Sequence, residues 1–197
     1  MHLNQETAEH FVGVALEATL QGSSKNLAAL PAPIYVTDEL GFVTYFNEAC
    51  VVFAGRVPVI GRDRWCVTWR LLTYEGKALP HDQCPMAQAI RQKRPLRGAV
   101  AIAIRPDRAR RTFSPFPTPL LNKTGTLLGA VNVLLDLTRE REIIDLRRKA
   151  KECRQWAAAA TNPQTANAFN RLAEEQETKA ETLDRLNKLD AGPFLRS

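Results

Sequence analysis

The order of strand-like segments along the chain is the strongest constraint on the fold. Residues 34–37 and 42–46 are rich in β-branched and aromatic residues, and the turn-type sequence DELG joins them, which predicts a β-hairpin. Three more strand-like runs follow at residues 98–104, 111–116 and 127–135. Helical segments fill the interval between the two groups. This order predicts an α+β fold with a five-stranded antiparallel sheet and helices on one face.

Two helices are expected between the groups of strands. Asn47 directly follows the hairpin and predicts an N-cap for a helix through EACVVF. A second helix is expected from about residue 83 to about residue 92. An irregular region that contains Trp65 and Trp69 separates these helices.

Three alternating prolines, Pro115, Pro117 and Pro119, interrupt the second of the late strands. Each proline lacks a backbone donor, and in an extended chain the three missing donors point to the same side. Two outcomes are open. Either the hydrogen-bond ladder on that side stops near Ser114, or this stretch leaves the sheet.

The segments on both sides of the strands are helical in pattern. Residues 4–21 carry apolar side chains at helical spacing, and a highly charged helix begins at Arg139. Asn162 and Pro163 predict a break and a restart of this second helical region. We therefore expect an N-terminal helix in residues 1–26, a mixed domain in residues 27–138 and a helical hairpin in residues 139–197. 

Composition and charge restrict the class of protein. No apolar run is long enough to cross a bilayer, and the N-terminus does not resemble a secretory signal. The four cysteines form no CxxC pair, which indicates reduced thiols and a cytoplasmic location. The net charge of +6 lies on the middle of the chain, where the densest basic run, RPDRARR, is typical of a solvated turn. We therefore expect neither nucleic acid nor a membrane as partner.

The segment PHDQCPM allows a structural and a functional interpretation. In the first, Asp82 or His81 is the N-cap of the helix that follows, and Met86 faces the core. In the second, His81 and Cys84 are ligands. Zinc needs four ligands, and Cys66 adds only a third, so no metal site is predicted. No third group orients a Cys–His pair, so no catalytic residues are assigned.

The sequence resembles a PAS domain. The resemblance is carried by LAALPAPIYVTDELGFVTYFNEACVVFAGR and by LLGAVNVLLDLTRERE, and it covers roughly residues 27–140. The first stretch contains an acidic-glycine turn and the capping Asn47, and the second runs from a strand through residues 136–138 into a charged helix. The middle, from RWCVTWRLL to PHDQCPMA, is similar to PAS modules that precede bacterial sensor kinases. The tail resembles a small bacterial helical segment without an established activity.

The resemblance implies a non-catalytic sensory or protein-interaction module in bacterial signal transduction, whose flanking helices pass a change to a partner. Asp136 and Thr138 would form the hinge to those helices. No phosphoacceptor helix or ATP site follows Thr138, so the chain is not expected to be a kinase or another enzyme. The cysteine motif of flavin photosensors is absent, so a flavin adduct is not expected.

The alternative function is a haem- or small-ligand-binding sensor that uses PHDQCPM, since some PAS domains bind haem through this helix. His81 or Cys84 would then be the axial ligand. The candidate ligand-binding residues are Trp65, Cys66, Trp69, His81, Cys84 and Met86. For the two tryptophans, a packing role in the core is the competing interpretation.

The helices outside the mixed domain predict a homodimer. Their apolar stripes include Ile143, Leu146, Ala150, Leu172 and Leu183. The small residues on the first helix of the hairpin leave it short of buried area, and the stripe of the N-terminal helix has no evident place on the sheet. A second copy would cover these stripes most simply. In a monomer they would form a docking surface for another signalling protein, such as a histidine kinase.

Overall fold

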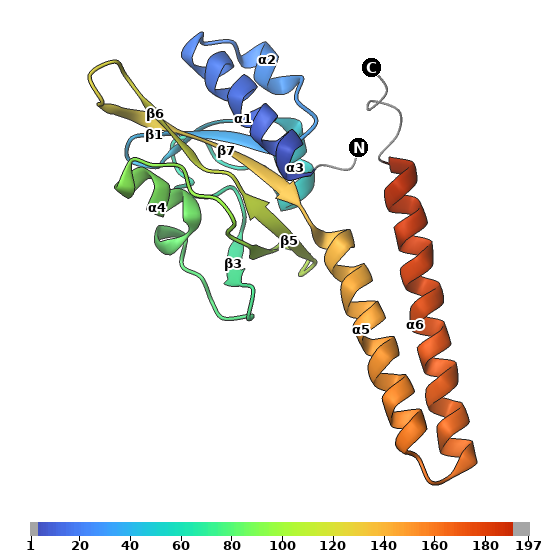
Figure 1. Ribbon diagram of the computed structural model, residues 1–197. Helices are drawn as coiled ribbons and strands as arrows, with labels where there is room; N and C mark the ends of the chain where they lie inside the picture. Colours follow the sequence, from blue (N-terminus) through green and yellow to red (C-terminus); the bar gives the residue numbers. More distant parts are fainter. Residues whose placement is uncertain (1–3, 191–197) are drawn as a thin grey trace. The chain divides into compact units, whose positions relative to one another are not determined.

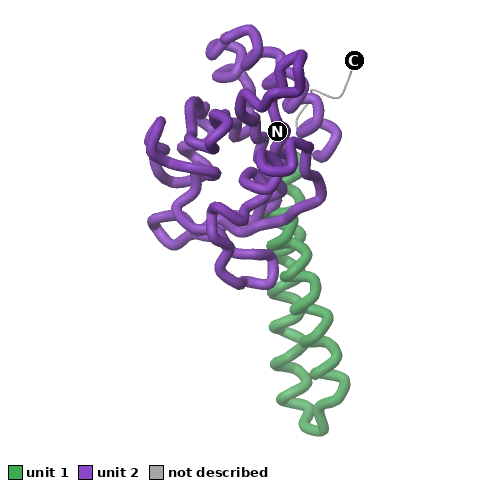
Figure 2. Tube along the Cα trace, turned by 90° about the vertical axis from the view of Figure 1, so that its left-hand side faces the viewer, with its two compact units in different colours: residues 1–2, 138–197 green, residues 3–137 purple. Residues whose placement is uncertain are grey.

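The computed structural model describes residues 4–190, which form two compact units. Residues 4–137 contain a β-sheet with its covering helices, and residues 138–190 contain two long helices (Figures 1 and 2). The elements of the first unit are α1 (Gln5–Leu20), α2 (Ser24–Ala28), β1 (Ile34–Asp38), β2 (Val43–Phe46), α3 (Glu48–Ala54), β3 (Arg70–Thr73), the 3-10 helix η1 (His81–Gln83), α4 (Pro85–Gln92), β4 (Ala101–Ile104), β5 (Arg110–Pro115), β6 (Thr118–Leu121) and β7 (Leu127–Asp136). The second unit consists of α5 (Thr138–Ala159) and α6 (Pro163–Asp190).

The sheet is antiparallel and places the first and last strands of the unit side by side. Its order is β2-β1-β7-β5-β4-β3, and β6 also pairs with β7. The hairpin, the intervening helices and the late strands follow the predicted sequence of elements, so the unit has the PAS-like α+β fold that the sequence predicts. The described sheet has seven strands instead of five, because the short β3 and the proline-containing β6 were not predicted.

The proline series marks the place where β5 loses its neighbour β4. The β4–β5 ladder ends at the pair Ala101–Phe113, while the chain stays beside β7 through β6. The Phe116 N–H donates to the Val133 carbonyl of β7 (N–O 2.9 Å), so the alternating proline nitrogens face away from β7. The first expected outcome is therefore correct, since the ladder stops on one side while the stretch remains in the sheet.

The two faces of the sheet bury separate apolar cores. The inner core lies beneath α3 and α4 and includes Tyr35 of β1 and Leu134 of β7. The outer core lies beneath α1 and includes the alternate residues Ile34 and Val133. Figure 1 shows α1 lying across β1 and β7. The N-terminal helix thus has the place on the sheet that the sequence analysis could not find, and helices cover both faces instead of one.

Asn47 joins three segments of the chain, in addition to the predicted capping of α3. Its side-chain oxygen accepts from the N–H of Cys50 in the first turn of α3 (3.2 Å) and from the N–H of Ile34 in β1 (3.0 Å). Its side-chain nitrogen donates to the carbonyls of Leu30 (3.2 Å) and Ala32 (2.8 Å). Asn47 is 3% exposed, so this set of bonds satisfies a buried amide fully.

The second unit is a helical hairpin that pairs within one chain. Asn162 accepts from the Gln164 N–H (2.8 Å) and α6 begins at Pro163, as the sequence predicts. Small side chains form the apolar cluster between the helices: Ala150, Cys153 and Ala173. Charged pairs such as Arg147–Asp184 (3.2 Å) cross between the two helices. None of the described helices is long and apolar enough to cross a membrane.

The residues predicted to form the dimer contact differ in their exposure within this hairpin. Ile143 and Ala150 are buried, Leu146 and Leu183 are half-buried, and Leu172 is 45% exposed. Buried side chains cannot also meet a second copy, so Leu172 keeps the most surface for such a contact. Dimerisation through the helices stays a prediction.

Gly129 tests the close pairing of β1 and β7. It has φ +149, and a Cβ at this position would overlap the carbonyl oxygen of Thr37. Gly129→Ala should lower the free energy of unfolding by more than about 2 kcal/mol, since backbone must move in the centre of the sheet. The control is Gly125→Ala, at φ +78 with no atom near the new methyl, which should cost about 1 kcal/mol. Urea denaturation measures both, and equal costs would contradict the close approach.

Candidate functional site

The PHDQCPM segment turns the chain into α4. The short helix η1 comes first, and α4 begins at Pro85, where a first-turn N–H needs no helical partner. Cys84 is the N-cap residue, with an extended backbone and no capping bond from its side chain. The expectation that Asp82 or His81 is the N-cap is therefore wrong. Asp82 is exposed, and its carbonyl accepts from the Arg91 guanidinium (2.7 Å).

Four of the six candidate ligand-binding residues lie together in or against the inner core. They are Trp65, Cys66, Cys84 and Met86. Trp69 lies outside this group, 42% exposed, with the guanidinium of Arg70 stacked 4.3 Å from its ring centroid. His81 is half-buried and does not belong to the core cluster. The structure thus separates the six residues into a core group and two residues at its margin.

Three thiols are buried in the inner core, those of Cys50, Cys66 and Cys84. The Cys66 sulfur lies 3.1 Å from the hydroxyl of Thr68, and the Cys84 thiol donates to the carbonyl of Trp65 (3.7 Å). Burial raises the pKa of Cys84 to about 12 and also raises the pKa values of Cys50 and Cys66. All three are therefore protonated at neutral pH.

A protonated thiol is a weak nucleophile, because nucleophilic attack needs the thiolate. Within residues 4–190, no group of three or more His, Cys, Asp or Glu side chains could hold a metal ion. The three thiols consequently act as small apolar side chains that fill the space between sheet and helices.

A buried polar pair crosses the inner face of the sheet. Tyr35 of β1 lies directly opposite Asn132 of β7, and the Asn132 amide donates to the Tyr35 oxygen (2.9 Å). The Tyr35 hydroxyl donates in turn to the carbonyl of Trp65 (3.0 Å). The side-chain oxygen of Asn132 accepts from the Phe116 N–H (2.9 Å), which it shares with the backbone carbonyl of Val133. This chain of bonds links β1, β7, the β5–β6 junction and the loop before β3.

This pair was not predicted from the sequence, although each residue carries a signal. A single asparagine within the apolar run GAVNVLL, and a tyrosine within IYV, must find partners if the strands are buried. Thr37 gives the same signal. Thr37 lies two residues after Tyr35 on β1, so its side chain is on the same inner face. Its hydroxyl is buried and has no hydrogen-bond partner among the described residues. Burial also raises the pKa of Tyr35, so the pair is uncharged.

Trp65 is held in an unusual backbone conformation at the edge of this core. Its φ is +68, in the left-handed region that non-glycine residues seldom adopt. Its N–H donates to the Gly41 carbonyl (2.7 Å), and its ring occupies the space where any Cβ on Gly41 would lie. Arg64 covers the ring from 4.5 Å. These contacts hold the Trp65 carbonyl where both Tyr35 and Cys84 donate to it.

His81 lies near an ion pair on the loop before β3. Arg56 bonds to the Asp63 carboxylate and to the carbonyl of Val67 (3.1 Å), which fixes this loop. The Nε2 atom of His81 is buried and has no partner among the described residues. Burial lowers the pKa of His81, and the nearby Asp63 opposes that shift. His81 therefore offers a buried ring nitrogen that makes no hydrogen bond among the described residues.

The expected hinge residues stand at the junction of β7 and α5. Asp136 is the last residue of β7, and its carboxylate lies 3.7 Å from the Arg111 guanidinium of β5. The Leu137 N–H donates to the carbonyl of Thr112 (2.8 Å). Thr138 is the first residue of α5. One residue therefore separates the central strand from the hairpin.

No protein-family model matches the chain, and no curated protein matches it. Among solved structures, a PAS domain from Colwellia psychrerythraea is similar at 15% identity, with 61% of this chain and 98% of that chain covered and a TM-score of 0.41. The LOV domain of a blue-light-activated histidine kinase from Erythrobacter litoralis has 19% identity, 55% and 98% coverage, and a TM-score of 0.43.

The PAS domain of BvgS from Bordetella pertussis gives a comparable result. It has 19% identity and a TM-score of 0.41, and the similarity covers 68% of this chain and 98% of that chain. These similarities are weak, so the PAS-like assignment rests on the order of elements and on the antiparallel strand order described above.

The buried thiols predict a specific loss of stability at high pH. A thiol that ionises near pH 8.5 in the unfolded chain stays protonated in the fold, so stability falls as pH rises above that value. Replacing Cys84, whose folded pKa is about 12, should reduce this fall. Between pH 8 and pH 10, Cys84→Val should lose about 2 kcal/mol less unfolding free energy than the unchanged chain.

The control is Val133→Ala, which removes buried volume from the outer core and no ionisable group. It should be less stable at every pH and keep the pH dependence of the unchanged chain. Urea denaturation at several pH values measures both. A Cys84→Val variant with an unaltered pH dependence would show that this thiol ionises normally in the fold.

Proposed function

We propose that the chain is a non-catalytic sensory or protein-interaction module of PAS type, acting in bacterial signal transduction in the cytoplasm. The observation that carries the proposal is the direct connection of β7 to α5 through Leu137 alone. β7 bears Asn132, which belongs to the polar chain of the inner core. A change in that core therefore acts on a strand that continues almost directly into a helix.

The chemistry of the inner core supports a role in binding or sensing. Its polar side chains include the Tyr35–Asn132 pair, the hydroxyls of Thr37 and Thr68, and three protonated thiols, all of them uncharged. The Thr37 hydroxyl has no partner among the described residues, so in this proposal it is the group that a small neutral ligand would engage. These side chains offer no activated nucleophile, which favours a non-catalytic role.

The partner in this proposal is a second copy of the chain or another signalling protein such as a histidine kinase. The hairpin formed by α5 and α6 is the element proposed to carry the contact. Its charged surface and its exposed apolar residues, which include Leu172 at 45% exposure, are suited to a helical partner.

The haem alternative receives different support from its two candidate ligands. Cys84 is 2% exposed, and its thiol packs in the inner core and donates to the carbonyl of Trp65. His81 keeps a buried and unpartnered Nε2 atom. Any haem bound through PHDQCPM would therefore use His81.

Absorption spectroscopy of the purified chain with one equivalent of haemin tests the alternative. We expect no Soret band beyond that of free haemin. The matched variants are His81→Ala and Cys84→Ala. A new Soret band that disappears in His81→Ala and persists in Cys84→Ala would replace the proposed function with a haem sensor.

Hydrogen exchange tests the connection from core to hairpin. Asn132→Leu removes the bond to Tyr35, and we expect faster amide exchange in the first turns of α5, at residues 138–146. The control is Val12→Ala, a buried residue of α1 in the outer core. Both variants are first compared for global stability by urea denaturation, so that local opening is separated from overall destabilisation.

The result that supports the proposal is a change in α5 with Asn132→Leu that exceeds the change with Val12→Ala. The proposal would be contradicted if both variants had equal amide exchange rates in α5, or if neither rate exceeded that of the unchanged chain. The inner core would then have no effect on the hairpin.

A further inference from the structure

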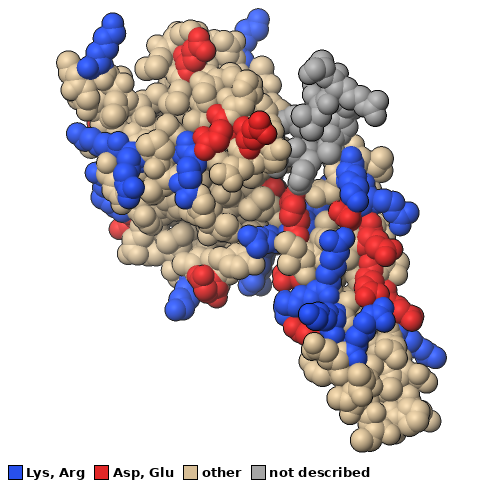
Figure 3. All heavy atoms as spheres, in the orientation of Figure 1, with Lys and Arg blue, Asp and Glu red and all other residues tan. Residues whose placement is uncertain are grey.

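The turn region of the helical hairpin is free of charge. Residues 155–170, here called the tip, contain no Lys, Arg, Asp or Glu, whereas Arg154 and Arg171 stand at its two ends. Figure 3 shows uncharged atoms at this end of the hairpin and charged side chains along the rest of it. Solvation of the hairpin does not explain this charge-free segment, because charged residues suit any exposed helix face.

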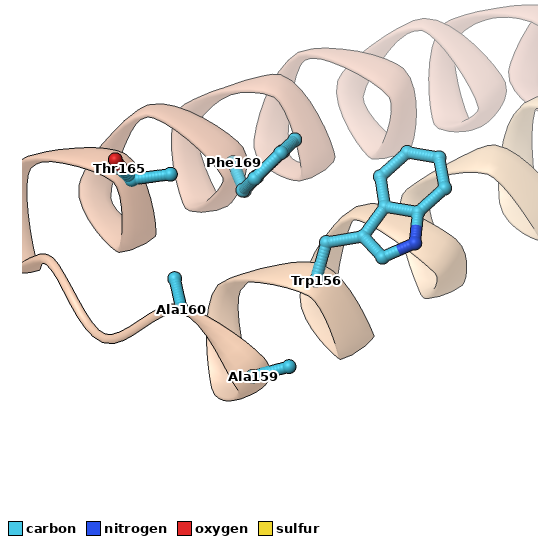
Figure 4. A pocket seen from close by; sticks show the side chains of 5 residues that line it. All are labelled: Trp156, Ala159, Ala160, Thr165 and Phe169. Carbon is cyan, nitrogen blue, oxygen red and sulfur yellow. The ribbon is translucent and has the colours of Figure 1, made fainter.

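An apolar hollow lies on the tip. It has a volume of about 490 Å³ and is lined by Trp156, Ala159, Ala160, Thr165 and Phe169. Figure 4 shows Trp156 on α5 and Phe169 on α6 at one side of the hollow, with the two alanines at the end of α5 and the turn beyond it. The two aromatic rings lie 5.6 Å apart at a tilt of 56°.

Trp156 keeps much of its surface exposed in addition to its contact with Phe169. Its side chain is 53% exposed, whereas the apolar cluster between the helices is made by Ala150, Cys153 and Ala173. Leu172, one turn beyond Phe169 on α6, adds a further side chain that is 45% exposed. Large exposed side chains around an apolar hollow are typical of protein contact surfaces, where tryptophan contributes more than most residues.

We propose that the tip is the contact surface for a second copy of this chain. In a two-fold contact each surface meets itself, so charged residues would face like charges, and the tip has none. Trp156 forms one wall of the hollow and is 53% exposed, so in a two-fold contact the ring of each copy can meet the hollow of the other. At the margin, Arg154 is already paired with Glu177, so the contact leaves this charge satisfied.

The contact rests on the proposed function, because it specifies which part of the hairpin meets a second copy. Its failure would leave the sensory role of the inner core untouched. Standard interfaces bury roughly 800 Å² on each partner, and a helical tip offers less than that. We therefore expect a reversible dimer with a dissociation constant on the order of 10 μM. A weak dimer of this kind responds to local concentration.

Sedimentation velocity of the full chain from about 1 to about 200 μM tests the proposal, a range that spans the expected constant. Ala159→Lys places a charge in the hollow and should weaken the dimer at least about tenfold, because an unpaired charge resists burial. The matched control is Ile144→Lys, on an exposed residue of α5 outside the tip, and it should change the constant less than about threefold. Circular dichroism confirms that both variants keep their helices.

Trp156→Ala provides a second variant that adds no charge, and it should weaken the dimer by a similar factor to Ala159→Lys. Three results would overturn the proposal. If the chain stays monomeric at every concentration, it has no such contact. If Ala159→Lys does not weaken the dimer, the dimer forms through another surface. Binding of the unchanged chain to phosphatidylcholine vesicles, lost in Ala159→Lys, would identify a lipid surface as the occupant of the tip.

Discussion

The burial of β7 on both faces and along both edges is the constraint on which the rest of the first unit depends. β1 pairs with one edge, and β5 and β6 pair with the other. Such a strand can hold a polar side chain only if that side chain is bonded, and Asn132 is bonded to Tyr35 and Phe116. At Gly129, β7 lies so close to the Thr37 carbonyl of β1 that no Cβ would fit, which explains the glycine at this position.

Local signals predicted much of this fold correctly. The hairpin, the late strands and the capping role of Asn47 each follow from residues that are adjacent in the sequence. The place of α1 did not follow, because an apolar stripe shows that a helix needs cover and does not show which surface supplies it. Nor was the N-cap of α4 predicted, since Cys84 caps the helix without a side-chain bond, while Pro85 at the first helical position was the signal for its start.

The candidate site was harder to predict for the same physical reason. Cys66, Cys84 and Met86 were expected near one another, and they meet in the inner core. Tyr35 and Asn132 are separated by 97 positions and meet only because β1 pairs with β7 in one register. A buried, unreactive thiol was the favoured expectation for Cys84, because no third group orients a Cys–His pair. The fold agrees, since Cys84 lies in the inner core and burial raises the pKa of its thiol.

The four bonds of Asn47 also determine how this part of the chain can open. One side chain holds the linker carbonyls of Leu30 and Ala32, the first residue of β1 and the first turn of α3. If one of these segments detaches, the amide loses partners in the others, and a buried unsatisfied amide is costly. The three segments therefore form one cooperative unit of local unfolding. A protease that attacks the linker must wait for the strand and the helix to open as well.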